Sequence, residues 1–185
     1  MELKDYQKYR WFYTSSGKLV VGGKNAEQNE QLIKILKELK KDKISMHTTE
    51  PGSPFTIILS DIKEVKESDI KESAIFTACF SRAWKDKKNK AAVDIFKLSQ
   101  LYKLPVMKTG TWGVKGKIKM ITVNLKLVLT KQKNKLRAVP KDSIKSKKEA
   151  LVQITPGRID KSLILSKIQM AIKESLNQEE LINAL

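Results

Sequence analysis

The sequence predicts an α+β protein in which a mainly antiparallel sheet is packed by two helices and followed by a C-terminal helical extension. Two patterns indicate this class: helix-type periodicity occurs early and late in the chain, and most strand-type segments follow one another in hairpin-like order. Apolar residues make up 41% of the 185 residues, which is enough for the core of one domain. We expect this domain to span residues 1–157 and the helical extension to span residues 158–185.

Residues 10–34 begin with the pattern of a tight β-hairpin. Residues 11–13 and 18–21 have the aromatic and branched side chains of strands. Ser16 and Gly17 lie between them and are typical of a tight turn, because glycine adopts positive φ without steric cost. The pair Gly22-Gly23 then allows the backbone to bend sharply and to approach a neighbouring segment closely.

A helix is expected to follow from Asn25, which is a suitable N-cap with Gln28 three residues later as its capping partner. Asn29 and Glu30 fall in its second turn on a polar side, where folding gives no reason to specify them. The buried stripe of this helix should consist of Leu32, Ile35, Leu36 and Leu39.

The middle of the chain predicts three more strands and a second helix. The strands are expected over residues 44–47, 55–59 and 91–98, although residues 91–98 also fit a helix, and a polar loop over residues 47–54 separates the first two. The helix should begin near Ser68 or Asp69 and run to a basic end at residues 81–88, which the helix dipole favours. Its expected buried residues are Ile70, Ala74, Ile75, Ala78, Cys79 and Ala83.

The second half predicts a glycine-rich segment at residues 109–116 and strands over residues 117–130, 136–139 and 150–154. A change of phase near Ile121-Thr122 predicts a bulge or break in the first of these strands. A C-terminal helix is expected to begin at Asp160 or Ser162, and residues 177–185 should form a short helix or a frayed tail. The core-facing side of residues 117–130 should comprise Ile118, Met120, Val123, Leu125, Leu127 and Leu129.

Basic residues are concentrated in one part of the chain. Lys and Arg number 37 against 20 acidic residues, a net charge of +17. Residues 106–170 carry 16 basic and 3 acidic residues, whereas the other 120 residues carry 21 and 17. Such an imbalance favours a polyanionic partner, either nucleic acid or an anionic membrane. The alternative is a lysine-rich composition that only keeps the protein soluble.

Membrane insertion and an internal disulfide are not expected. No apolar run approaches the ~20 residues that a spanning helix needs, and the N-terminus lacks a signal-peptide pattern. No helix pairs a basic face with an aromatic apolar face, so no peripheral membrane attachment is expected either. Cys79 is the single cysteine and lies in an apolar pattern, which indicates a buried thiol in a reducing cytoplasm.

The residues that common catalytic and metal sites need are scarce. One histidine and one cysteine cannot build a zinc site of usual ligand count. The phosphate-loop and dinucleotide-binding patterns are absent. A Ser-His-Asp site would have to use His47, and no serine has the sequence context of a nucleophile. Paired carboxylates stay open as an alternative. We expect no catalytic residues, no metal and no cofactor.

Several short segments combine cations, glycine backbone and aromatic rings, which are the groups that bind phosphates and unpaired bases. We expect Trp84 to be the exposed tryptophan among the three, because it lies near a basic helix end. The segments are Tyr9-Arg10-Trp11, Gly22-Gly23-Lys24-Asn25, Arg82-Ala83-Trp84-Lys85 and Lys108-Thr109-Gly110-Thr111-Trp112.

These segments belong to longer motifs. The stretch RWFYTSSGKLVVGGKNAEQNEQLIK resembles the opening of the NFACT-R domain, the RNA-binding module of the NFACT proteins of ribosome quality control. The residues that match the family's pattern are Arg10, Trp11, Phe12, Ser15, Gly17, Leu19, Val20, Gly23, Lys24, Asn25, Ala26, Gln28, Asn29 and Glu30. Further segments similar to family motifs are Met46-His47 with Gly52-Ser53, Ser81-Arg82-Ala83-Trp84, Lys108-Thr109-Gly110-Thr111-Trp112 and Val114-Lys115-Gly116-Lys117.

The resemblance covers roughly residues 8–130 and implies a stand-alone NFACT-R protein that binds tRNA or ribosomal RNA, with the ribosome as a candidate partner. One departure is Thr49, which stands where the family has an acidic residue, so no role of that carboxylate is carried over. The tailing of stalled chains is attributed to the full-length proteins and is not carried over either.

We therefore expect a cytoplasmic protein without catalysis of its own that recognises structured RNA in translation or ribosome-associated quality control. Asn25, Asn29 and His47 should form hydrogen bonds near the bases. Arg10, Ser53, Trp84 and Thr109 complete the predicted site. The residues expected to hold phosphates are Lys24, Arg82, Lys85, Lys108, Lys115 and Lys117.

Two other functions remain open at this point. One is an auxiliary component or enzyme of an RNA-modification pathway, with His47 and Asn29 in a pocket. The other is binding of duplex DNA, which competition between tRNA and duplex DNA would test. The sequence indicates no oligomeric state.

Overall fold

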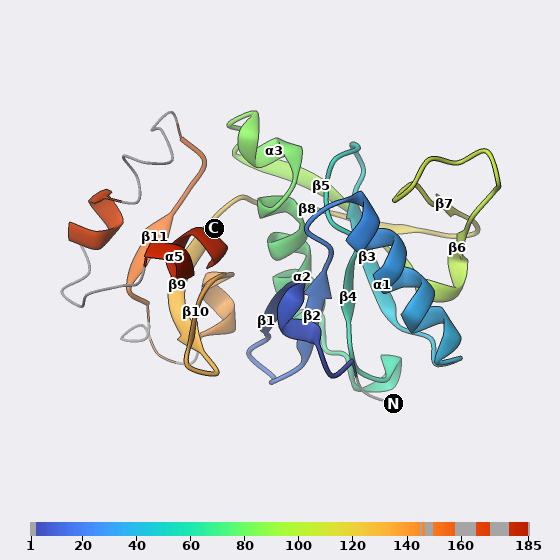
Figure 1. The fold of residues 1–185 in the computed structure, drawn as a ribbon, viewed down its shortest axis with the longest axis horizontal. Helices are drawn as coiled ribbons and strands as arrows, with labels where there is room; N and C mark the ends of the chain where they lie inside the picture. The colour runs from blue at the N-terminus through green and yellow to red at the C-terminus, as the bar shows by residue number, and fades with distance from the viewer. Residues whose placement is uncertain (1–2, 145, 147–149, 158–165, 171–177, 185) are drawn as a thin grey trace.

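The computed structural model describes residues 3–144, 146, 150–157, 166–170 and 178–184 (Figure 1). Its centre is a six-stranded sheet in which every neighbouring pair of strands is antiparallel. The predicted α+β class with a mainly antiparallel sheet is therefore confirmed. In spatial order the strands are β1 (Arg10–Tyr13), β2 (Leu19–Gly22), β4 (Thr56–Ile58), β3 (Ile44–Thr48), β5 (Lys90–Lys97) and β8 (Lys119–Asn124).

Two helices of 13 residues cover the opposite faces of this sheet. α1 (Ala26–Glu38) packs on one face and α2 (Glu67–Cys79) on the other, because side chains along each strand alternate between two apolar cores. Val21 belongs to the core under α1, and its neighbour Val20 belongs to the core under α2. Short helical turns complete this part: η1 (Tyr6–Lys8), η2 (Ile62–Glu64), α3 (Arg82–Lys85), η3 (Leu98–Gln100) and η4 (Lys141–Ser143).

Two smaller sheets lie at opposite ends of the molecule (Figure 1). β6 (Leu101–Tyr102) pairs with β7 (Gly113–Val114) at one end. At the other end, β9 (Leu127–Gln132) lies between β10 (Lys135–Val139) and β11 (Val152–Ile154). α5 (Gln178–Ala184) packs on β10. The side chains of β9–β11 and of α5 join the core under α2.

Residues 166–170 are also helical, which agrees with a C-terminal helix. Its predicted beginning at Asp160 or Ser162 lies outside the described residues. The small helix over residues 178–184 agrees with the short terminal helix that the sequence predicts.

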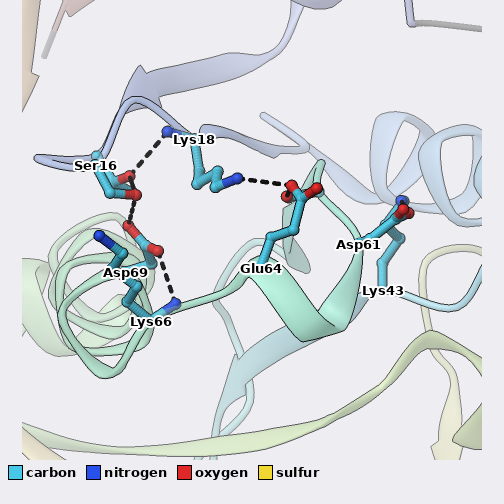
Figure 2. Close-up of polar contacts among 9 residues, drawn as sticks. Ser16, Lys18, Lys43, Asp61, Glu64, Lys66 and Asp69 are labelled. Carbon is cyan, nitrogen blue, oxygen red and sulfur yellow. Dashed lines mark hydrogen bonds and ion pairs between the residues drawn. The ribbon is translucent and has the colours of Figure 1, made fainter.

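The turn between β1 and β2 is fixed to α2 by two buried carboxylates. Ser16 Oγ donates to Asp69 Oδ1 at 2.7 Å (Figure 2). The amide and hydroxyl of Ser15 donate to the two oxygens of Glu72 at 2.8 and 2.6 Å. Asp69 and Glu72 are both buried. The two serines of the hairpin turn therefore serve the fold, and they hold β1 and β2 in place above α2.

The outer edge of β1 is covered by side chains of the C-terminal sheet. Gln132 at the end of β9 accepts from the Tyr13 amide at 2.8 Å and donates to the Tyr13 carbonyl at 2.9 Å. Arg137 on β10 donates from Nε to the Trp11 carbonyl at 3.2 Å. An edge strand leaves such backbone groups unpaired, so these two side chains take the place of a neighbouring strand.

The buried face of α1 differs from the predicted stripe. Ile35 is exposed, whereas Ile33, Asn29 and Glu30 are buried together with Leu32 and Leu36. Both stripes have helical spacing, so periodicity alone does not choose between them. The choice follows from Asn29 and Glu30, whose side chains hold neighbouring loops and therefore turn the helix so that its polar second turn faces inward.

The predicted break near Ile121-Thr122 is wrong. β8 runs without interruption through these residues and pairs with β5, and the chain instead leaves the sheet at Leu125-Lys126 to begin β9. Met120 is 58% exposed because it lies opposite Asp94, on the face that carries an open cleft rather than on the face under α2. Ile118 is likewise exposed, so neither residue faces the core as predicted.

Candidate nucleic-acid interface

A cleft of about 540 Å³ opens beside the N-terminus of α1. Its other walls are the loop that follows β3 and the glycine-rich loop before β7, and the end of β5 contributes Asp94 and Phe96. Three segments that are far apart in the sequence therefore meet at one end of the sheet. The predicted site residues that line this cleft are Lys24, Asn25, Asn29, His47, Ser53 and Thr109.

The N-terminus of α1 is capped as the sequence predicts. Asn25 Oδ1 accepts from the Gln28 amide at 2.8 Å, and Gln28 Oε1 accepts from the Lys24 amide at 3.0 Å. The amides of the first helical turn have no acceptor inside a helix, and the helix dipole is positive there. This end of α1 is therefore suited to an anionic group, and Lys24 and Asn25 are exposed beside it.

Asn29 ties α1 to the loop that follows β3. Its Oδ1 accepts from the Phe55 amide at 3.1 Å in a buried position. A side chain at Gly23 would place its Cβ 2.3 Å from this oxygen and 2.6 Å from the Asn29 amide. Gly23 is thus needed for the close approach of β2 and α1. Asn29 holds the loop that forms this wall of the cleft through its buried side chain.

Glu30 ties α1 to the glycine-rich loop in the same manner. Its Oε2 accepts from Lys103 Nζ at 2.8 Å and from the Gly110 amide at 3.0 Å. Gly110 has φ of +76°, and a Cβ there would lie 2.7 Å from Ala26. Burial alone would raise the pKa of Glu30, but the hydrogen bonds from Lys103, Gly110 and Lys34 lower it to about 2. The carboxylate is therefore ionised and anchors this wall of the cleft.

Lys103 extends this anchor to the backbone of the glycine-rich loop. Besides Glu30, its ammonium donates to the carbonyls of Lys108 at 2.8 Å and Thr111 at 3.0 Å. The ammonium also lies 5.5 Å from the centre of the Trp112 ring, which is half-buried in the cleft wall. The loop that carries Thr109 is held in one shape by these contacts.

His47 lies on the sheet floor of the cleft. Its Nδ1 is 2.7 Å from the Thr48 carbonyl, which only accepts, so Nδ1 carries the proton of the neutral ring. Burial lowers the pKa of His47, although Thr48, Asp94 and Ser53 act in the opposite direction. The imidazole is therefore neutral near pH 7, and Nε2 is a hydrogen-bond acceptor. The ring packs on Phe55 with 4.6 Å between centroids.

The loop beyond His47 is held by its own polar groups. Ser53 Oγ accepts from the Thr48 amide at 2.9 Å and donates to the Pro54 carbonyl at 3.1 Å, so this hydroxyl already has partners within the loop. Thr49 donates to Asp94 Oδ1 at 2.8 Å. The side chain at position 49 is thus paired with a carboxylate on β5, opposite His47 in the register.

Arg82, Trp84 and Lys85 lie outside the cleft, on or near α3. Arg82 lines a separate cavity of about 150 Å³, and its amide donates to the Gly52 carbonyl at 2.8 Å, so α3 adjoins the back of the cleft loop. Lys85 is exposed. Trp84 is half-buried against the core under α2, so the expectation of an exposed indole is wrong. None of the three tryptophans is fully exposed.

The remaining predicted residues flank the cleft or lie away from it. Lys108, Lys115 and Lys117 are exposed on the segment that surrounds β7. The carbonyls of Lys115 and Lys117 accept from Gln100 Nε2 at 2.8 and 3.0 Å, which shapes this segment. Arg10 is farther away and stacks its guanidinium 4.2 Å from the centre of the Phe80 ring.

Two of the cations near the other end of α1 are paired with carboxylates. Lys18 Nζ lies 2.7 Å from Glu64, and Lys43 Nζ lies 3.4 Å from Asp61 (Figure 2). These residues line a second, larger cavity of about 860 Å³ near the C-terminal end of α1. Their charges are partly neutralised within the protein, so this end is less suited to a polyanion than the cleft beside Lys24.

Residue types alone did not identify Glu30, Lys103 and Asp94 as parts of the site. Glu30 matches the family pattern, and this match is the feature of the sequence that indicates a role for it in the site. Lys103 and Asp94 lie in segments with no motif, and only the fold brings them to the cleft. Within the described residues, no group of three or more potential metal ligands is present. The described helices are all too short or too polar to cross a membrane.

The sequence matches the family described as NFACT protein RNA binding domain over residues 8–116. This match covers more than half of the chain, and the chain therefore belongs to that family. The matched residues include every wall of the cleft.

Two curated relatives are similar over this part of the chain. The Archaeal Rqc2 homolog aRqcH of Methanocaldococcus jannaschii is 44% identical over 84 residues, which are 45% of this chain and 12% of that protein. The Ribosome quality control complex subunit NEMF homolog of Drosophila melanogaster is 29% identical over 80 residues, 43% of this chain and 8% of that protein. The chain thus corresponds to a small fraction of either relative.

One solved structure with the same fold is the C-terminal part of the fibronectin/fibrinogen-binding protein from Streptococcus suis. The TM-score is 0.55 with 23% sequence identity, and the comparison covers 62% of this chain and 45% of that one. At this identity the likeness concerns the fold alone.

Proposed function

We propose that this chain binds structured RNA, tRNA or ribosomal RNA, through the cleft at the N-terminus of α1. The proposal also holds that it acts in the cytoplasm in translation or ribosome-associated quality control, with the ribosome as a candidate partner and without catalysis of its own. Membership in an RNA-binding family and the similarity to two ribosome quality-control relatives support it. The observation that carries it is the meeting of a helix N-terminus, a lysine and ring faces in one cleft.

Each wall of the cleft has a different task in this proposal. The first turn of α1 and Lys24 bind a phosphate, because both present positive charge at the same rim. Asn25 and the neutral imidazole of His47 form hydrogen bonds to a base. Asn29, Glu30 and Ser53 do not contact RNA and instead hold the loops in position.

A salt titration of RNA binding tests the phosphate contacts. If Arg82 and the exposed lysines of the predicted site neutralise about six phosphates, the logarithm of the affinity should fall by roughly 4 to 5 per tenfold rise in salt. Lys24→Ala should lower the affinity at every RNA sequence and reduce the slope by about 1. Lys63→Ala removes an exposed lysine of η2 and is the matched control. An affinity that does not change with salt concentration would refute the phosphate contacts.

A second candidate function is that of an auxiliary component or enzyme of RNA modification, and the position of His47 in the cleft favours it. Replacing His47 by Ala separates the two functions. For a binding domain, His47→Ala should weaken RNA binding severalfold. For an active site, His47→Ala should keep RNA binding but lose modification of the RNA. The modification is measured in an extract that contains the modifying enzymes.

A further inference from the structure

A third cavity, of about 370 Å³, lies where β10 and α5 meet the edge of β1. Its wall carries Lys24, Lys135 and Arg137 together with Trp11, and α5 adds Glu179 and Glu180. Lys135, Arg137 and α5 all lie beyond the residues that match the family, 8–116. This cavity is therefore formed jointly by residues inside the family match and residues that follow it.

Arg137 is the central residue of the cavity. Its side chain is buried, and the residue is 7% exposed. Nε donates to the Trp11 carbonyl at 3.2 Å, and the guanidinium stacks 4.7 Å from the centre of the Trp11 ring. An arginine has five N–H donors, and this contact uses one of them. Arg137 also lines the cavity, so its guanidinium adjoins this space.

Arg10, Arg137 and Lys24 lie close enough together for their positive charges to act on one another. Burial lowers the pKa of Arg137 to about 10, with Arg10 contributing and Glu180 opposing. Burial, Arg10 and Arg137 also lower the pKa of Lys24. Among the residues that the structure describes, neither Arg10 nor Arg137 forms an ion pair with a carboxylate.

Of the two acidic residues of α5, Glu180 is engaged by the backbone of β10. Glu180 Oε1 accepts from the Leu136 amide at 2.9 Å, which directs this carboxylate to the backbone of β10. Buried cations without a partner are costly, and like charges at close range add to that cost. A bound anion would remove both penalties, and a guanidinium is well suited to hold a phosphate by two N–H groups.

We infer that this cavity, which we name the Arg137 pocket, binds a backbone phosphate of the RNA. The identity of the ligand rests on the proposed function. Lys24 lines both the cleft and the Arg137 pocket, so one RNA strand passes from the cleft across Lys24 to Arg137 and Lys135. The C-terminal part of the chain then adds to RNA affinity, and it does more than cover the edge of β1.

Binding of RNA by full-length variants tests this inference. Arg137→Gln and Lys135→Ala should each weaken RNA binding severalfold and reduce the slope of log affinity against log salt by roughly 1. Glu180→Gln keeps an oxygen for the Leu136 amide but removes a negative charge, so it should strengthen binding. Lys126→Ala, an exposed lysine between β8 and β9, is the control and should leave binding unchanged.

The outcomes distinguish this inference from the proposed function. If Lys135→Ala and Arg137→Gln bind RNA like wild type while Asn25→Ala with His47→Ala loses binding, the Arg137 pocket is refuted and the cleft stands. If neither set loses binding, both fail. Should Arg137→Gln not fold, Lys135→Ala and Glu180→Gln decide, because both side chains are at the surface of the cavity and opposite shifts are expected.

A competition arm distinguishes RNA phosphates from a free phosphate. At constant ionic strength, excess inorganic phosphate should weaken RNA binding of wild type more than that of Lys135→Ala. If inorganic phosphate raises the melting temperature of wild type but leaves RNA binding of every variant unchanged, the pocket serves a free phosphate, and the assignment to RNA is overturned.

Discussion

At the scale of single residues, the cleft depends on polar groups that are buried rather than exposed. Asn29 and Glu30 were expected on the polar side of α1, yet each is buried and holds one wall of the cleft. Gly23 is required for the same arrangement because its position has no room for a side chain. These residues determine where Lys24 and His47 lie because they hold the walls of the cleft in place.

Gly23→Ala should destabilise the protein by about 1 to 3 kcal/mol, because the new methyl group forces Asn29 or the backbone of α1 to move. Urea denaturation followed by circular dichroism measures the change. Gly157→Ala is the control, since a Cβ there meets no atom closer than 3.9 Å, and its effect should stay within about 0.5 kcal/mol. If both variants unfold at the same urea concentration, Asn29 can move aside without a loss of stability, and the expectation is contradicted.

The lowered pKa of Glu30 predicts a loss of stability in acid. A carboxylate whose folded pKa lies near 2 stabilises the native state above its usual pKa of 4.5, and this contribution is lost as the pH falls from about 4.5 to 2. Its full size is about 3 kcal/mol. Unfolding curves at pH 7, 5, 4 and 3 should show Glu30→Gln less stable at neutral pH, with the difference from wild type shrinking in acid. A difference that is independent of pH would contradict the role of the charge.

At the scale of elements, the outer edge of β1 is the place where the six-stranded sheet and the C-terminal three-stranded sheet are joined. Gln132 offers both a donor and an acceptor to Tyr13, as a strand would, and Arg137 pairs with the next outward carbonyl. The three-stranded sheet thereby closes the larger sheet on this side. A neighbouring strand would add its own unpaired edge, whereas side chains end the pairing at once.

Gln132→Ala should cost about 1 to 3 kcal/mol, because it leaves the amide and carbonyl of Tyr13 unpaired in a half-buried position. Hydrogen exchange should report faster exchange at the Tyr13 amide, while the amides of α1 keep their protection. Gln153→Ala, an exposed glutamine on β11, is the matched control. Unchanged exchange at Tyr13 would mean that water replaces Gln132 without loss.

At the scale of the whole molecule, two apolar cores share one sheet, and the second core extends into the C-terminal segment. Leu181 and Ala184 of α5 are buried in the core under α2. The basic residues of β9 and β10 are therefore part of a packed body, at the end of the molecule opposite β6 and β7 (Figure 1).

The proposed domain of residues 1–157 can be tested as a fragment. It keeps all three sheets but loses the burial of Leu181, which is worth about 2 to 3 kcal/mol. We expect the fragment to fold cooperatively with a lower free energy of unfolding than the full chain. A shorter fragment of residues 1–116 loses β8 and exposes the edge of β5, so it should not fold. Circular dichroism and NMR spectra of the backbone amides show whether each fragment is folded. A folded 1–116 fragment would refute the expectation.

The sequence was sufficient for local features and insufficient for contacts made over long distances along the chain. The cap formed by Asn25 and Gln28 was predicted, because both partners lie within one turn. The exposure of Ile35 and of Met120 was not, since it depends on which face a distant loop or strand occupies. No pattern in the sequence predicts the Arg137 pocket, because Arg10 and Arg137 come together only in the folded chain.

Cys79 has a practical consequence for all of these experiments. It is the single cysteine of the chain, it is buried in the core under α2, and burial raises the pKa of its thiol. A buried thiol of this kind reacts poorly with alkylating reagents at neutral pH. A cysteine introduced at the rim of the cleft, such as Thr109→Cys, would therefore accept a fluorophore or photo-crosslinker selectively in the otherwise native chain.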